Sequence, residues 1–316
     1  MRTASVRAAA PAHRAVPAAS APKSGGGRLA GVATMIGSGL SNQIGAATGS
    51  FAFPALGPLG VVAVRQYVAA IVLIAVGRPR PRSFTWRQWW PVLLLALVFG
   101  TMNLSLYSAI DRIGLGLAVT LEFLGPLAIA LAASRRRADA CWAVLAAAGV
   151  ITLMRPRPSA DYVGTGLGLL AAVCWASYIL LNRTVGRRIP GAQGSATAAT
   201  LSALMFLPVG IVLAIRQPPT ASAVGCAVAA GVLSSAVPYL ADLFTLRRVP
   251  APAFGLFMSV NPVLAAVVGW IVLGQRLGWI EWTGVGAVVV ANALSVAGRI
   301  RAKATPQQAP QEMAGR

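Results

Sequence analysis

Glu122 is the residue whose type and position point most directly to chemistry in this chain. It is a carboxylic acid near the middle of an apolar stretch that runs from 113 to 133. Pro126 follows in the same stretch, and a proline has no N–H to hydrogen-bond the carbonyl of the residue four positions earlier. The pattern therefore predicts a weakened helix in which an acidic side chain and a backbone acceptor can face a cavity.

Arg65 is the cation that Glu122 could meet, because it also lies inside an apolar stretch, from 57 to 77. Two roles stay open for Glu122: it could bind a substrate or a proton, or it could pair with Arg65 to hold the protein together. Two positions stay open for Arg65, because a guanidinium about 12 Å into a helix can snorkel outward or point inward. An inward Arg65 could hold a substrate carboxylate through two parallel hydrogen bonds.

Neutral polar side chains inside apolar stretches are the next candidates, with hydrogen bonding between helices as their alternative role. The residues expected in a substrate site besides Glu122 and Arg65 are Asn103, Tyr107, Tyr178, Tyr239 and Asn261. Pro126 and Pro262 are expected to interrupt their helices. Gln43, Trp175 and Ser234 are weaker candidates of the same kind, and the pair Gly45 and Gly49 predicts close helix packing.

The elements that must position these residues are membrane helices. The chain is 57% apolar and 11% charged, with a mean hydropathy of +0.71, whereas soluble domains carry roughly 25% charged residues. A helix needs about 20 apolar residues to cross a bilayer. Ten stretches between charge clusters predict an all-α polytopic membrane protein: 29–50, 57–77, 90–110, 113–133, 138–154, 163–181, 193–214, 222–246, 252–273 and 278–298.

Several classes of function lack the residues that they need. The only histidine is His13, in the N-terminal tail, so no Ser-His-Asp triad and no histidine metal site is expected. The only lysines are Lys23 and Lys303, so the lysine of a nucleotide-binding GxxxxGK loop is missing. We expect no enzyme activity, no cofactor and no metal. The net charge of +20 lies in loops and tails beside apolar stretches, which favours contact with lipid headgroups over nucleic acid.

The distribution of positive charge predicts the orientation. If both tails are cytoplasmic, 21 of the 27 Lys and Arg residues lie on the cytoplasmic side and 5 on the other, and Arg65 lies inside an apolar stretch. This asymmetry agrees with the positive-inside rule. The sequence from Arg112 also aligns without gaps on the sequence from Arg248, which places Pro126 on Pro262. The expected organisation is a tail (1–28), two halves (29–154 and 163–298) and a second tail (299–316). Five crossings per half would make the halves an inverted repeat, a plan typical of secondary transporters.

Four motifs carry a resemblance to a known family: GPLGVVAVR at 57–65, LEFLGPLAIAL at 121–131, LSSAVPY at 233–239 and LRRVPAPAFGLFMSVNPVLAAVVGWIVLG at 246–274. The chain resembles the drug/metabolite transporter superfamily with two EamA repeats, and within it the threonine/homoserine exporter group. The resemblance implies that each half is an EamA-like repeat. The chain departs from the group's pattern at Asn261 and Gln275, where an acid is expected, and at Asp242, where a Glu is common.

The function that this reading favours is export of small metabolites, most of all amino acids such as threonine and homoserine, by proton antiport across the inner or plasma membrane. Efflux of drugs, uptake of another small solute, and a scaffold or channel without transport stay open as alternatives. The expected partners are a small-molecule substrate and the lipid bilayer, and assembly as a homodimer is left open.

Overall fold

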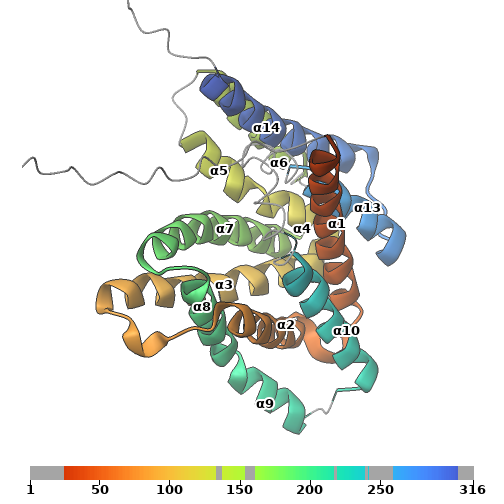
Figure 1. Ribbon diagram of the computed structural model, residues 1–316. Coiled ribbons are helices and arrows are strands. Elements are labelled where there is room, and N and C mark those ends of the chain that lie inside the picture. Colours follow the sequence, from red (N-terminus) through yellow and green to blue (C-terminus); the bar gives the residue numbers. More distant parts are fainter. Residues whose placement is uncertain are drawn as a thin grey trace, which may run out of the picture.

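The structure is a computed structural model that describes residues 25–132, 137–153, 161–216, 219–238, 241 and 259–304. Every regular element within these ranges is a helix (Figure 1). The helices are α1 (Gly25–Ser50), α2 (Phe53–Gly77), the short 3-10 helix η1 (Pro81–Ser83), α3 (Trp86–Ile113), α4 (Leu115–Glu122), α5 (Leu124–Ala132), α6 (Arg137–Leu153), α7 (Tyr162–Arg188), α8 (Gln193–Met205), α9 (Leu207–Arg216), α10 (Ala221–Gly231), the π-helix η2 (Val232–Ala236), α13 (Asn261–Leu273) and α14 (Trp279–Ala304).

The apolar helices fall on the predicted stretches. Four segments are long and apolar enough to cross a membrane: α2, α3, α7 and the continuous run of α8 and α9. Shorter apolar helices lie within α4 and α5, α6, α10 and η2, α13 and α14. An all-helical architecture suits a bilayer, because a helix satisfies its own backbone hydrogen bonds where water is absent. The all-α prediction is confirmed for the described residues, and the ten crossings and the inversion of the halves stay predictions.

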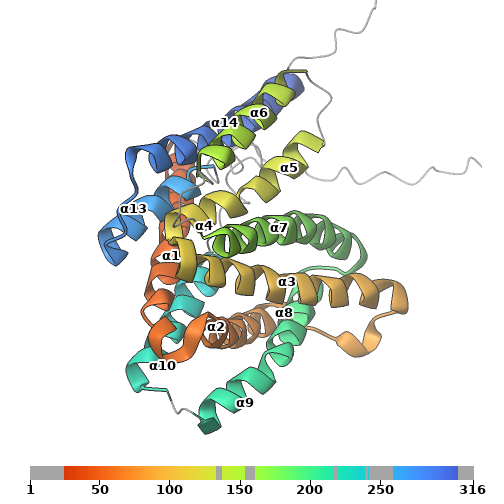
Figure 2. The ribbon, with the colours of Figure 1, turned by 180° about the vertical axis from the view of Figure 1, so that it is seen from behind.

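The helices pack around a central pair. In both views α3 and α7 lie side by side across the middle of the molecule, with α2 and α8 next to α3 (Figure 2). Helix α1 packs against α10, η2 and α13 on one side of this pair, and α6 pairs with α14 on another. This arrangement brings α1, α2, α3, α4, α7, α8, η2 and α13 around one interior space.

Two of the apolar stretches contain a turn a few residues before their prolines. Helix α4 ends at Glu122, Phe123 forms a turn, and α5 begins at Leu124, just before Pro126. In the second half, Ser259 and Val260 form a turn, and α13 begins with Asn261 and Pro262. Proline fits the first turn of a helix, where its missing N–H is not needed. Glu122 is therefore the last residue of α4, and Asn261 is the first residue of α13.

A third and a fourth irregularity have their own local causes. Helix α2 is kinked at Gly57, whose φ of 63° is open to glycine without strain, and Pro58 follows. Helices α8 and α9 are separated at Phe206, just before Pro208. The hydroxyl of Tyr67 donates a hydrogen bond of 2.7 Å to the carbonyl oxygen of Phe206, so this break has a polar partner on α2.

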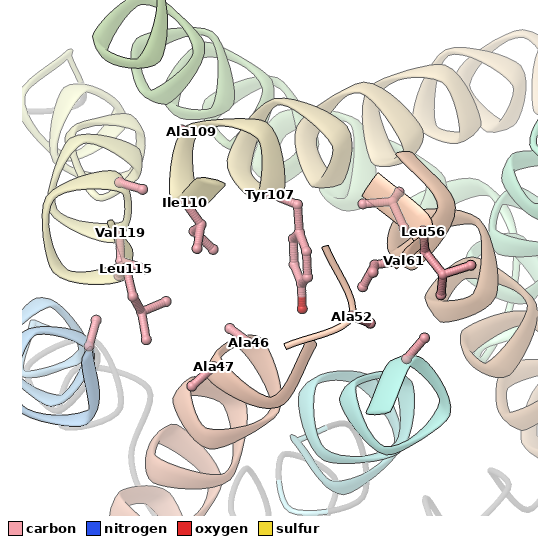
Figure 3. Close-up of a cluster of buried hydrophobic side chains, with 14 of the residues drawn as sticks. Ala46, Ala47, Ala52, Leu56, Val61, Tyr107, Ala109, Ile110, Leu115 and Val119 are labelled. Carbon is pink, nitrogen blue, oxygen red and sulfur yellow. The ribbon is translucent and has the colours of Figure 1, made fainter. Parts of the chain in front are cut away.

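The core between α1, α2, α3 and α4 is built largely from small residues. Figure 3 shows the ring of Tyr107 reaching from α3 toward Ala46 and Ala47 of α1 and Ala52 of the turn that follows α1, and these small side chains leave room for it. A Cβ atom on Gly49 would lie 3.1 Å from Tyr107 and from Ala230, and a Cβ on Gly45 would overlap Ser234. The close helix packing predicted for this glycine pair is therefore confirmed.

Candidate functional site

A cavity of about 350 Å³ lies in the interior space between the helices. This volume falls in the range of roughly 300–1,000 Å³ that is typical of small-molecule sites. Polar residues from eight elements line the cavity: Ser38, Asn42 and Gln43 of α1, Arg65 of α2, Asn103 and Tyr107 of α3, Glu122 of α4, Tyr178 and Asn182 of α7, Ser195 of α8, Ser234 and Ser235 of η2, and Asn261 of α13.

The structure brings most of the predicted site residues together. Glu122, Arg65, Asn103, Tyr107, Tyr178 and Asn261 all line this cavity, although they come from separate stretches of sequence. Tyr239 lies outside the described residues, as does Asp242. The sequence did not single out Asn42, Asn182, Ser195 or Ser235. Each of these is a common polar residue in or near a helix, and nothing in its local sequence sets it apart.

The Glu122 carboxylate faces the cavity at the last residue of α4. Its side chain is 7% exposed and forms no hydrogen bond or ion pair with the described residues. No contact of 4.0 Å or less joins it to Arg65, so the structural pairing that stayed open in the sequence is not formed in this state. A buried carboxylate without a partner is costly, because it gives up its hydration without compensation. The position therefore favours a partner that arrives from outside the protein.

Arg65 points inward. Its Nη2 atom donates a hydrogen bond of 3.2 Å to the carbonyl oxygen of Ser234 in η2, and its guanidinium carbon lies 5.0 Å from the centre of the Tyr107 ring. The alternative in which Arg65 snorkels to the membrane surface is therefore not the one adopted. Neither Arg65 Nε nor the Tyr107 hydroxyl, both buried, has a hydrogen-bond partner among the described residues. Two donors are thus left over beside the cavity.

The π-helix η2 provides the acceptor for Arg65. A π-helix places extra backbone in one turn, and such turns are frequent at functional sites. The Oγ of Ser41 donates a hydrogen bond of 2.9 Å to the carbonyl of Leu233, and the Oγ of Ser234 donates one of 2.9 Å to the carbonyl of Asn42. These two bonds fix η2 to α1 in both directions. The Ser234 carbonyl is thereby held where Arg65 reaches it.

The amide and aromatic residues complete the lining. Gln43 Nε2 lies 3.4 Å from Asn261 Oδ1, and Asn103 Nδ2 donates a hydrogen bond of 2.8 Å to the carbonyl of Phe99 in its own helix. The rings of Phe123 and Trp175 meet edge to face, with centroids 4.6 Å apart. Tyr178 lies against Phe99, with centroids 6.1 Å apart.

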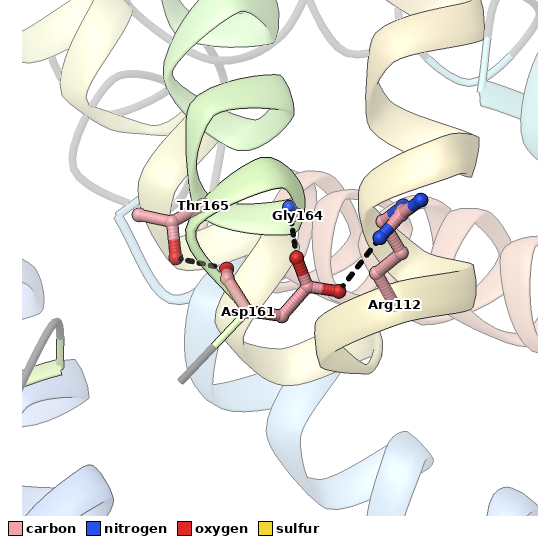
Figure 4. A network of polar contacts seen from close by, with 4 residues as sticks. All are labelled: Arg112, Asp161, Gly164 and Thr165. Carbon is pink, nitrogen blue, oxygen red and sulfur yellow. Dashed lines mark hydrogen bonds and ion pairs between the residues drawn. The ribbon is translucent and has the colours of Figure 1, made fainter. Parts of the chain in front are cut away.

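One end of the bundle is fixed by two contacts between residues before 154 and residues after 160. Arg112 Nη1 donates to Asp161 Oδ2 at 3.0 Å, and Figure 4 shows Asp161 at the start of α7, where its Oδ1 accepts from Gly164 N at 2.8 Å. The Gly164 N–H and then the Arg112 guanidinium hold the pKa of Asp161 below its ordinary value of 3.8. Gln275 Oε1 accepts from the N–H of Leu115 at 2.9 Å and so caps the start of α4.

Gln275 therefore has a structural role outside the cavity. An uncharged acceptor serves to satisfy the free N–H at a helix start, so an acid is not needed there. Glu281 likewise lies outside the cavity, in the first turn of α14, where an acid favours a helix N-terminus. Of the two described positions at which the chain departs from the exporter pattern, Asn261 lines the cavity and Gln275 does not.

Comparison with known proteins gives relatives along most of the chain. A model of the EamA-like transporter family matches residues 163–297. The threonine/homoserine exporter RhtA of Escherichia coli K12 is 38% identical over 258 residues, an alignment that covers 80% of this chain and 86% of RhtA. The uncharacterized transporter YwfM of Bacillus subtilis is 24% identical over 71% of this chain and 79% of its own. A solved crystal structure with 19% identity has the same fold, with a TM-score of 0.57 over 87% of this chain and 99% of that one.

An alignment of 258 residues is too long to lie within one half of this chain, so the match to RhtA extends into both halves. On this identity and coverage, the chain belongs to the EamA-like transporter family, so it is a multi-pass membrane transporter and not an enzyme.

Proposed function

We propose that this protein exports small zwitterionic metabolites, most of all amino acids such as threonine and homoserine, in exchange for protons. The observation that carries the proposal is that a carboxylate, Glu122, and an inward guanidinium, Arg65, line one cavity and form no ion pair with each other. A zwitterion needs one anionic and one cationic contact, and the cavity supplies one of each. The identity to the threonine/homoserine exporter RhtA supports the same substrate class.

The carboxylate of the substrate would bind between Arg65 and Tyr107. Among the described residues, Arg65 Nε and the Tyr107 hydroxyl have no hydrogen-bond partner, and the guanidinium lies against the Tyr107 ring. Hydrogen bonds from a guanidinium to a carboxylate are roughly twice as strong as those between neutral groups. The Ser234 carbonyl and the Tyr107 ring already restrain the guanidinium, so little side-chain freedom is lost when the substrate arrives.

The ammonium of the substrate would bind Glu122, which gives a mechanism for coupling. A carboxylate in this position can hold either a proton or an ammonium group, but not both. Transport in one direction with the ammonium bound, and return with the proton bound, exchanges a substrate for a proton. No nucleotide is needed, because the proton gradient supplies the free energy.

The proposed architecture has ten crossings in two inverted EamA-like repeats, with both termini in the cytoplasm of an inner or plasma membrane. The turns at Phe123 and at Ser259 occupy matching positions when Pro126 is aligned with Pro262, which supports the repeat. Transporters of this plan bind substrate near the midplane at broken helices. Glu122 and Asn261 lie next to these two turns.

The test is transport by the purified protein in liposomes, with a panel of labelled solutes and an imposed pH gradient. We expect accumulation of threonine and homoserine against their gradient when protons flow the other way. Extrusion of a lipophilic cation without movement of any amino acid would instead support drug efflux. Movement of no solute in the panel would contradict the proposed substrate class. Movement of an amino acid in the same direction as the protons would contradict exchange and support proton-coupled co-transport.

A further inference from the structure

Gln43 is buried in the cavity wall with an unused hydrogen-bonding atom. Its side chain is 1% exposed, and its Oε1 has no hydrogen-bond partner within the described part of the chain. The proposal above assigns the carboxylate and the ammonium of an amino acid, but it leaves the recognition of the side chain unassigned. Building on that proposed function, we infer that Gln43, held against Asn261, recognises the side-chain hydroxyl of the substrate.

Packing between helices does not account for Gln43. Its Nε2 lies 3.4 Å from Asn261 Oδ1, which is beyond the usual 2.7–3.2 Å range of an N–H···O hydrogen bond. Gln66 is a glutamine of the same molecule whose role is in packing between helices. It is also 1% exposed, it does not line the cavity, and its Nε2 donates a hydrogen bond of 2.6 Å to Ser202 Oγ. Gln43 differs from Gln66 in its longer contact and in its place in the cavity wall.

The surroundings place Gln43 close to the proposed carboxylate site. The carbonyl of the preceding residue, Asn42, accepts from Ser234 Oγ, and the carbonyl of Ser234 accepts from Arg65 Nη2. These bonds tie the turn of α1 that carries Gln43 to the residue that would bind the carboxylate. On the same side of α1, a Cβ on Gly39 would lie 3.0 Å from Asn261 Oδ1, so the glycine lets α13 approach. Short amino acids could therefore reach both sites at once.

The chemistry of an amide matches a hydroxyl. A hydroxyl donates one hydrogen bond and accepts others, and a primary amide offers both an acceptor and donors. The substrate hydroxyl would donate to Gln43 Oε1 and accept from an amide N–H of Gln43 or Asn261. A substrate of the same shape with a methyl group would leave the buried oxygen unpaired. Sites built to bind a hydroxyl discriminate strongly against analogues that lack it.

The experiment compares amino acids that differ in one hydroxyl. Liposomes that contain the protein and unlabelled threonine exchange it for labelled threonine, and unlabelled competitors inhibit the exchange. Valine is the analogue of threonine that lacks the hydroxyl group, and 2-aminobutyrate is the analogue of homoserine that lacks it. For the wild-type protein we expect half-inhibition by the hydroxylated member at a roughly tenfold lower concentration, as for the loss of one buried hydrogen bond.

Gln43→Met keeps the length of the side chain and removes its amide. The measured ratio is the valine concentration that gives half-inhibition divided by the threonine concentration that does so. We expect this threonine-to-valine ratio to fall close to one in the variant, mainly because threonine binds more weakly. Gln66→Met is the matched control and should keep the wild-type ratio, even where it lowers stability through the lost bond to Ser202. If Gln43→Met does not reach the membrane, Gln43→Ala makes no steric demand and should give the same narrowed ratio.

The outcomes separate this inference from the function on which it rests. A wild-type ratio that persists in Gln43→Met, or in Gln43→Ala, overturns the role of Gln43 and leaves amino-acid export in place. Equal inhibition by threonine and valine in the wild type also overturns it. Failure of the wild type to exchange any amino acid overturns the proposed function together with this inference.

Discussion

We expect Gly45→Ala to lower the stability of the protein by an amount that follows from the packing of α1. A Cβ added there would overlap Ser234 Oγ and lie 2.8 Å from Leu233 Cβ and 2.9 Å from the Ser234 nitrogen. Because the last of these contacts is with backbone, the π-helix η2 would have to move as a whole. Overpacking of this kind costs about 1–3 kcal/mol, and the lost bond from Ser234 to Asn42 adds about 1 kcal/mol.

Two other glycines of α1 provide a graded series of alanine variants. At Gly49 the nearest atoms would be 3.1–3.2 Å from the added Cβ, so a small shift of side chains would suffice. At Gly37 nothing lies within 4 Å, and an alanine there should be neutral or slightly stabilising, by about 0.5–1 kcal/mol. The expected order of stability is therefore Gly37→Ala above Gly49→Ala above Gly45→Ala.

The assay is the half-life of the purified protein in detergent on heating, read beside transport in liposomes. Gly45→Ala should shorten the half-life and reduce transport more than its remaining folded fraction explains, because a displaced Ser234 carbonyl releases Arg65. Gly37→Ala should match the wild type in both measurements. Equal stability and equal transport of Gly45→Ala and Gly37→Ala would refute the close packing of α1 on η2 and its role in holding Arg65.

Three further predictions concern the ends of the bundle. The contacts of Asp161 lower its pKa, so they stabilise the folded state fully at pH values above its ordinary pKa of 3.8. This stabilisation is lost as the pH falls through the lower folded-state pKa. In Asp161→Asn, thermal stability should lose that dependence at acid pH. Gln275→Ala should cost about 1 kcal/mol, because the Leu115 N–H loses its acceptor, whereas Gln275→Glu should keep the cap and its stability in the same thermal assay. Reporter fusions near residue 160 and near Arg187 should report opposite sides of the membrane, and finding both on one side would remove the inverted repeat.

The positions of the helices could be predicted from sequence because a bilayer imposes one simple requirement. Long charge-free stretches mark the hydrocarbon core, and the described helices fall on them. The ends were less well predicted. Helix α7 continues to Arg188, beyond the expected end at 181, since a helix that leaves the membrane can carry arginines into water. The π-helix from Val232 to Ala236 was not predicted, because its serines and alanines also suit an ordinary α-helix.

The site was predictable by residue type and not by arrangement. Glu122 and Arg65 stand out because charges inside apolar stretches are rare and costly. Their failure to pair was not evident, since it depends on Ser234 accepting a hydrogen bond from Arg65 and on Tyr107 lying against the guanidinium. Asn182 and Ser195, which form a hydrogen bond of 3.0 Å in the cavity wall, belong to different helices. Only the packing of α7 on α8 brings them together.

The central claim is that Glu122 alternates between a proton and the ammonium of the substrate, and one substitution tests it most directly. Glu122→Gln keeps the shape of the side chain and removes its charge. Glu281→Gln makes the same chemical change outside the cavity, in the first turn of α14, and serves as its control. Both variants should reach the membrane in wild-type amounts.

The measurement is the rate of threonine movement in liposomes with and without an imposed pH gradient. The account predicts that the gradient accelerates transport by the wild type and by Glu281→Gln, and that it has no effect on any transport that Glu122→Gln retains. Full acceleration by the pH gradient in a well-folded Glu122→Gln protein would contradict the account.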